Sequence, residues 1–180
     1  MDSDREQICF VTVGSTSFTA LISHVLSIDS LAALTTQGFR KLIVQYGNSD
    51  LPPRWVAGTQ NIHTTDERTI EVELWKFRDR VEDIVDQADL VISHAGAGSI
   101  LTSLRQKKTL IVVVNLSLMD NHQAELAKTL SSKSYLLVAT PESLSSVIST
   151  LSTAAPKLVS FPAPDSTRFL DVINEELNLV

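Results

Sequence analysis

The chain has 180 residues, of which 43% are hydrophobic and 20% are charged, with a net charge of −6 and a pI of about 5.1. This length and composition indicate one globular domain. The acidic charge argues against nucleic acid as a partner, because binding a phosphate backbone requires a basic surface. The single cysteine, Cys9, excludes an intramolecular disulfide. The polar first residues do not resemble a signal peptide, and the longest apolar run, 110–114, is too short to span a bilayer, so a cytoplasmic location is expected.

Continuous apolar runs, and in one case a strict alternation of apolar and polar residues, predict the strands of this chain. They are expected at 8–13, 41–46, 69–77, from Leu90 onward, 110–114 and 135–139. Amphipathic patterns and capping residues predict helices between them. These are expected to begin near Phe18, to span 81–87, 98–106 and 120–131, to begin again at Pro141, and to span 165–177. Residues 54–68 lack a clear period, so irregular structure is expected there.

The alternation of strands with helices predicts an α/β fold, with a Rossmann-like open parallel sheet and helices on both faces. The sequence contains no internal repeat or low-complexity tract, so residues 1–180 are expected to form one domain. In open sheets of this kind, ligands bind in a crevice at the carboxyl ends of the strands. Polar clusters that directly follow strands should therefore face a common crevice.

The most informative segment follows the strand that begins at Leu90 and has the sequence Ser93-His94-Ala95-Gly96-Ala97-Gly98-Ser99. Its glycines let the backbone approach a ligand, and the first N–H groups of the next helix attract anions such as phosphates. The segment is not a dinucleotide fingerprint, because Leu101 stands where the third glycine would be, and it is neither a P-loop nor a nucleophile elbow. Ligand contact is expected from Ser93, Ala95, Gly96, Ala97, Gly98 and Ser99.

A second glycine turn, Gly14-Ser15-Thr16, ends the first strand. It is either a small N–H-rich nest that contacts the ligand or an ordinary capped turn. His94 is expected to contact the ligand or the backbone rather than to transfer a proton, because a helix N-terminus disfavours the imidazolium form.

A second polar cluster follows the strand 110–114 and consists of Asn115, Asp120, Asn121, His122 and Gln123. Asp120 is a natural N-cap for helix 120–131. Four consecutive polar residues exceed what capping requires, so contacts with a polyhydroxyl ligand are expected. A metal site built from His94, His122 and Asp120 lacks metal-ligand spacing, so no metal is expected.

Three segments, 10–16, 93–99 and 110–123, resemble one family in sequence, order and spacing. It is the cytosolic subunit of the two-chain N-acetylglucosaminyltransferase of asparagine-linked glycosylation, and the similarity runs from about residue 8 to the C-terminus. The family is related to the donor-binding half of GT-B glycosyltransferases, including the bacterial enzyme that makes lipid II. The resemblance implies transfer of GlcNAc from UDP-GlcNAc to GlcNAc-diphosphate-dolichol, with inversion and without a cofactor. A membrane-anchored partner subunit would bind the lipid-diphosphate-linked acceptor and hold this chain at the cytosolic face of the endoplasmic reticulum.

The resemblance also implies roles for particular residues. Residues 93–99 and Gly14 would flank the diphosphate, while Asn115, Asp120, Asn121 and Gln123 would lie beside the sugar. His94 is the candidate general base, unless the partner supplies one. Helix 165–177 would dock on the partner, or else pack on its own domain.

One position departs from the family pattern. Thr102 stands where many relatives carry an acidic residue that binds the uridine ribose, so a weaker ribose contact or a substitute group is expected. The competing interpretation of the whole chain is a non-catalytic module that binds a nucleotide-sugar and regulates a partner.

Overall fold

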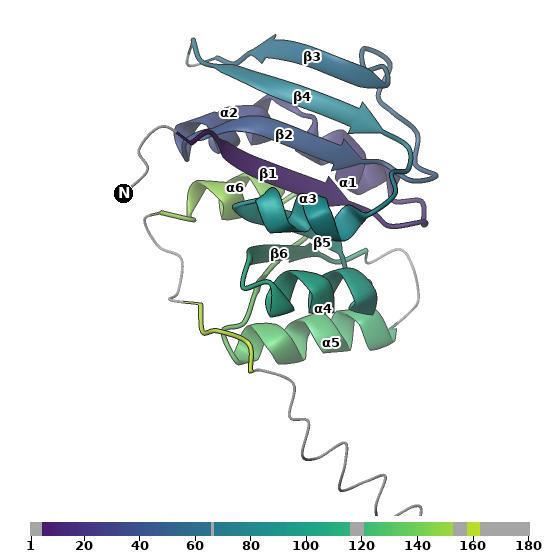
Figure 1. The fold of residues 1–180 in the computed structure, drawn as a ribbon, viewed down its shortest axis with the longest axis vertical. Coiled ribbons are helices and arrows are strands. Elements are labelled where there is room, and N and C mark those ends of the chain that lie inside the picture. Colours follow the sequence, from purple (N-terminus) through teal and green to yellow (C-terminus); the bar gives the residue numbers. More distant parts are fainter. Residues whose placement is uncertain (1–4, 66, 116–120, 153–157, 163–180) are drawn as a thin grey trace, which may run out of the picture.

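The computed structural model describes residues 5–65, 67–115, 121–152 and 158–162. Within them the centre is a seven-stranded sheet with helices packed on it (Figure 1). The strands are β1 (Gln7–Thr12), β2 (Phe39–Gln45), β3 (Gly58–His63), β4 (Thr69–Trp75), β5 (Leu90–His94), β6 (Thr109–Val113) and β7 (Leu137–Ala139). The helices are α1 (Thr19–Val25), α2 (Ile28–Thr36), α3 (Val81–Gln87), α4 (Ala97–Arg105), α5 (Asn121–Ser132) and α6 (Leu144–Ser149).

The strand order is β3-β4-β2-β1-β5-β6-β7, and all neighbours run parallel except β3 and β4. The chain builds outward from β1 to β2 and then returns to the other side of β1 with β5. The strand order therefore reverses between β1 and β5, where Thr12 is paired with Ser93. Such a switch point is where an open sheet leaves room for a ligand. The two glycine turns predicted to bind a ligand directly follow these two strands.

Both faces of the central strands β1, β5 and β6 are buried, which explains their continuous apolar runs. On β1, Cys9 and Val11 belong to one hydrophobic cluster, which includes side chains of α1, α2 and α6. Phe10, between them, belongs to the other cluster, which includes side chains of α3, α4 and α5. Figure 1 shows these two sets of helices on opposite sides of the sheet. The predicted α/β architecture is thus confirmed.

Two local predictions were wrong. Residues 54–68 were expected to be irregular, yet they contain β3, an antiparallel edge strand without a buried residue. Backbone hydrogen bonds to β4 hold this strand in place. Because none of its side chains is buried, its sequence shows no apolar period. The single helix expected from Phe18 is divided into α1 and α2, because Ser27 ends one helix and its hydroxyl caps the next by accepting a hydrogen bond from Ser30 N at 3.3 Å.

The remaining predicted elements agree within a few residues, except that the helix expected at Pro141 begins at Leu144. The predicted helix 165–177 lies outside the described residues. Within the described ranges, no single helix has the length and apolar character needed to cross a bilayer; only α1 and α2 taken together, bent by 56°, reach it by length and composition.

Candidate functional site

The two glycine turns meet around the imidazole of His94, the last residue of β5. A Cβ atom on Gly14 would lie 3.0 Å from His94 Cε1, and one on Gly96 would lie 2.7 Å from the same atom and closer still to Nε2. Gly14 also has a φ of +60°, which favours glycine on conformational grounds. The imidazole ring therefore occupies space that is free only because Gly14 and Gly96 have no side chains.

Burial lowers the pKa of His94 below the usual 6.5, and a hydrogen bond with the Thr12 carbonyl opposes that effect. The bond joins Nδ1 to Thr12 O over 3.4 Å. Because a carbonyl oxygen can only accept, Nδ1 carries the proton, and Nε2 is left as the basic nitrogen of a neutral ring. A neutral imidazole beside Gly96 is chemically able to accept a proton.

The loop that follows β1 is held by hydrogen bonds from the end of β2. Gly14 O accepts from Gln45 Nε2 at 3.3 Å. Ser15 O accepts from Asn48 Nδ2 at 2.9 Å, and Thr16 O accepts from Asn48 N at 3.0 Å. The carbonyl oxygens, which would repel an anion, are thus bonded on the β2 side.

Gly47 makes this arrangement possible. A Cβ atom there would lie 2.7 Å from Thr16 O and 2.8 Å from Gly14 O, and its φ is +56°. Sequence reasoning missed Gln45, Gly47 and Asn48, because their partners lie about 30 residues away along the chain. The available signal was the run Gln45-Tyr46-Gly47-Asn48 at the end of a buried strand.

Helix α4 begins on the other side of the crevice. Gly96 is its N-cap residue, and no side chain caps the N–H groups of its first turn. These N–H groups and the helix dipole give this end a partial positive charge that favours anions. Gly98 lies in this first turn with an ordinary negative φ, and a Cβ atom added to it would meet nothing within 4 Å. Packing therefore gives no reason for a glycine here.

A cavity of about 270 Å³ lies between these elements. Thr12, Gly14 and Gln45 line it from the β1–β2 side, and Val81, Glu82, Val85, Gly98, Ser99, Thr102 and Ser103 line it from α3 and α4. Four residues predicted from the sequence to bind the ligand, namely Gly14, Gly98, Ser99 and Thr102, thus share one hollow. Glu82, which the sequence analysis did not single out, adds a carboxylate-bearing residue to it.

The other predicted residues have varied settings. The buried Ser93 donates its hydroxyl hydrogen to His94 O at 2.8 Å, and Ala95 is buried. Thr16 donates to Val13 O at 2.8 Å. Ser15 and Ala97 are exposed, and Asn115 is partly buried just after β6.

The second polar cluster is only partly described. Asp120 lies outside the described residues, as do the side chains of Asn121, His122 and Gln123, although the backbone of these three forms the first turn of α5. Their ligand contacts stay predictions. Among the described residues, no group of three or more His, Cys, Asp or Glu side chains lies together as a metal site requires.

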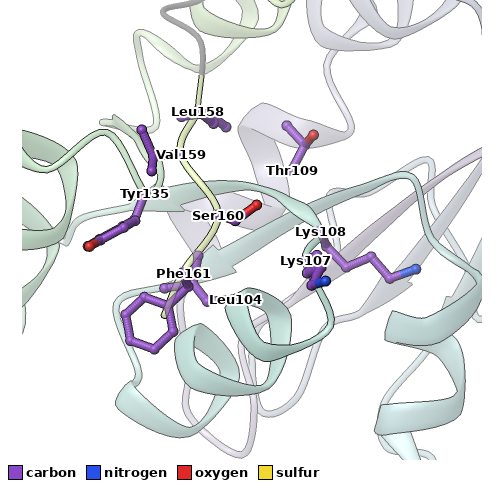
Figure 2. A pocket seen from close by; sticks show the side chains of 9 residues that line it. All are labelled: Leu104, Lys107, Lys108, Thr109, Tyr135, Leu158, Val159, Ser160 and Phe161. Atoms are coloured by element: carbon purple, nitrogen blue, oxygen red, sulfur yellow. The ribbon is translucent and has the colours of Figure 1, made fainter. Parts of the chain in front are cut away.

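A second cavity, of about 170 Å³, borders the start of β6, at the amino end of that strand (Figure 2). Segment 158–161 covers it, held by a 2.8 Å hydrogen bond from Val159 N to Ser134 O and by an edge-on contact between the rings of Tyr135 and Phe161. No residue predicted to bind a ligand lines this cavity.

The packing of His94 is testable through Gly96→Ala. The new methyl group would displace the imidazole, so the ring should gain solvent and its pKa should rise toward 6.5. An NMR pH titration of the His94 ring measures this shift. Gly98→Ala, whose methyl group meets no neighbour, should leave the lowered pKa unchanged. An unaltered pKa in Gly96→Ala would contradict the described packing.

The sequence matches a known family over most of its length. Residues 8–175 match the family described as the glycosyltransferase family 28 C-terminal domain. The UDP-N-acetylglucosamine transferase subunit ALG13 of Mus musculus is 42% identical over 136 residues, or 76% of this chain. The chain spans only 11% of the length of that relative and of its human counterpart. The Saccharomyces cerevisiae protein of the same name is 31% identical over 196 residues, and the match covers 96% of this chain and 97% of the yeast protein.

Solved structures show the same architecture. A solution NMR structure of ALG13 has a TM-score of 0.63 at 32% identity, and the match covers 93% of this chain and 94% of that one. The crystal structure of MurG from Acinetobacter baumannii has a TM-score of 0.58 at 17% identity, covering 83% of this chain and 41% of MurG, which supports the fold alone. Because the family match spans residues 8–175 and the yeast relative aligns along 96% of the chain, the chain belongs to the glycosyltransferase family 28 C-terminal domain family and has the fold of one half of a GT-B enzyme.

Proposed function

We propose that this chain binds UDP-GlcNAc in the cavity between β1, β2, α3 and α4 and is the donor-binding subunit of a GlcNAc transferase. The observation that carries the proposal is Gly98. It occupies a helical position where alanine would fit without a clash, and it faces the cavity at the uncapped end of α4. A glycine that packing does not require is explained by a ligand that approaches the backbone closely.

A diphosphate fits this end of the cavity on electrostatic grounds. The first-turn N–H groups of α4 would donate to its oxygens, and the carbonyl groups of the Gly14 loop are already bonded elsewhere. When the glycosidic bond of the donor breaks, negative charge grows on the departing UDP. Fixed N–H donors that need not reorganise would stabilise that charge in the transition state.

The sugar donor and the acceptor are proposed from the relatives. Their shared name describes them as UDP-N-acetylglucosamine transferase subunits, which supports UDP-GlcNAc as the donor and a partner chain. The acceptor would be a lipid-diphosphate-linked GlcNAc, as in the assembly of the chitobiosyl lipid for N-glycans. A membrane-anchored partner would present it at the cytosolic face of the endoplasmic reticulum. Attack by the acceptor hydroxyl on the face opposite UDP would invert the anomeric carbon.

His94 is the proposed general base within this chain. Its neutral ring, with Nδ1 held by Thr12 O, leaves Nε2 to take the proton of the attacking hydroxyl. Deprotonation would thus use a nitrogen whose position is fixed by the two glycine turns. The competing possibility is a module that binds the nucleotide-sugar and regulates its partner without transfer.

Gly98→Ala should separate stability from binding. Alanine favours the helix, so the free energy of unfolding should stay equal or rise by up to about 1 kcal/mol. The same methyl group would stand between the diphosphate and the backbone, so affinity for UDP-GlcNAc should fall about 10-fold or more. Denaturant unfolding and calorimetric titration measure the two quantities. Unchanged affinity would remove the main support for the proposal.

A transfer assay tests catalysis directly. The chain would be co-purified with its membrane partner and supplied with UDP-GlcNAc and lipid-diphosphate GlcNAc. His94→Ala should lower kcat by about 100-fold or more, as expected for the loss of a general base, with KM for UDP-GlcNAc changed less than about threefold. His63→Ala, at an exposed histidine on β3, is the control and should retain kcat. A complex that binds UDP-GlcNAc but never transfers it would indicate the regulatory module instead.

A further inference from the structure

The side-chain oxygen of Gln45 is a hydrogen-bond acceptor that has no donor among the described residues. Gln45 is the last residue of β2 and is 5% exposed, and it lines the candidate cavity. Its Nε2 donates to Gly14 O at 3.3 Å, whereas its Oε1 is buried and has no hydrogen-bond partner among the described residues. The carboxamide orientation follows from chemistry, because Gly14 O can accept a hydrogen bond only from the nitrogen.

An unpaired buried acceptor is unfavourable, so a native structure that keeps one usually has a reason for it. Here the acceptor belongs to a residue in the wall of a cavity. A diphosphate cannot satisfy it, because ionised phosphate oxygens only accept hydrogen bonds. The partner must be a group that donates, such as a hydroxyl.

We propose that Gln45 Oε1 accepts a hydrogen bond from a ribose hydroxyl of the bound uridine nucleotide and so contributes to its recognition. This inference rests on the proposed function and specifies a contact within the same cavity. Thr102, also in the wall, follows Gly98 by about one turn of α4, so it lies farther from the helix end that would hold the phosphates. A ribose joined to the diphosphate would therefore reach the part of the cavity that Thr102 lines. Gln45 lines the same cavity from the end of β2.

Gln45 would thereby replace a group that the chain lacks. Thr102 has a hydroxyl and no negative charge, so it forms no charge-assisted bond with a ribose diol. Glu82 lines the cavity from α3, but it is exposed and its carboxylate is open to water. Gln45 differs from Glu82 because its Oε1 has no hydrogen-bond partner among the described residues, so a donor on the ligand would supply the bond that this acceptor lacks.

The test measures calorimetric affinities of the full chain for UDP, 2′-deoxy-UDP and 3′-deoxy-UDP. The natural chain should bind one deoxy analogue about 10-fold more weakly than UDP. Gln45→Met should lose about 10-fold for UDP and less than about twofold for that same analogue, because the missing hydroxyl and the missing acceptor form one bond. Gln60→Met is the control, since Gln60 lies on β3, does not line this cavity, and likewise donates its Nε2 to a backbone carbonyl, Val56 O, at 2.9 Å. It should bind all three ligands as the natural chain does.

The outcomes separate the two levels of the proposal. If the natural chain does not bind UDP, the proposed function fails and the Gln45 contact fails with it. If the natural chain binds UDP but Gln45→Met weakens all three ligands equally, Gln45 only supports the Gly14 loop, and the ribose contact is overturned. Loss of ribose selectivity in Glu82→Gln and not in Gln45→Met would overturn it as well.

A measurement on the natural chain covers the case in which Gln45→Met does not fold. The ¹⁵N-labelled side-chain amide of Gln45 should change its NMR resonance when UDP is added and change much less with the weaker deoxy analogue. Equal responses to UDP and to both analogues would overturn the contact.

Discussion

The site depends on the pairing of β1 with β5, which places two glycine turns on either side of one histidine ring. Thr12 lies beside Ser93 in the sheet, so the residues that follow, Gly14 and Gly96, emerge next to each other. The His94 imidazole fills the space between them, and both positions exclude a side chain for that reason. The reversal of strand order at this point creates the opening, and the ring lies between the two glycine turns beside it.

Backbone groups, more than charged side chains, set the electrostatics of the opening. The chain has a net charge of −6, which offers no general attraction for an anion. Locally, however, β2 holds the carbonyl groups of the Gly14 loop, while α4 directs its uncapped first turn toward the cavity. An acidic protein can therefore offer a site for a diphosphate, because the relevant partial charges lie on oriented peptide groups.

The sequence predicted those features whose causes are local. Buried parallel strands produce continuous apolar runs, and the turn around Gly96 has its own pattern of small residues. The edge strand β3 was not predicted because it is held by backbone bonds to β4 and has no buried residue to produce an apolar pattern. Gln45 and Asn48 were missed because their bonds to Gly14 and Ser15 join distant segments. A pattern read along the chain does not contain such contacts.

The central claim is that peptide N–H groups at the two turns hold the diphosphate of a uridine nucleotide. A ¹⁵N NMR titration of the labelled chain with UDP tests it most directly. The account predicts that the largest amide shifts occur at Ser15, Gly98 and Ser99, with small shifts at β3 on the far edge of the sheet. It would be contradicted if saturating UDP left those three amides unchanged or shifted a different surface instead.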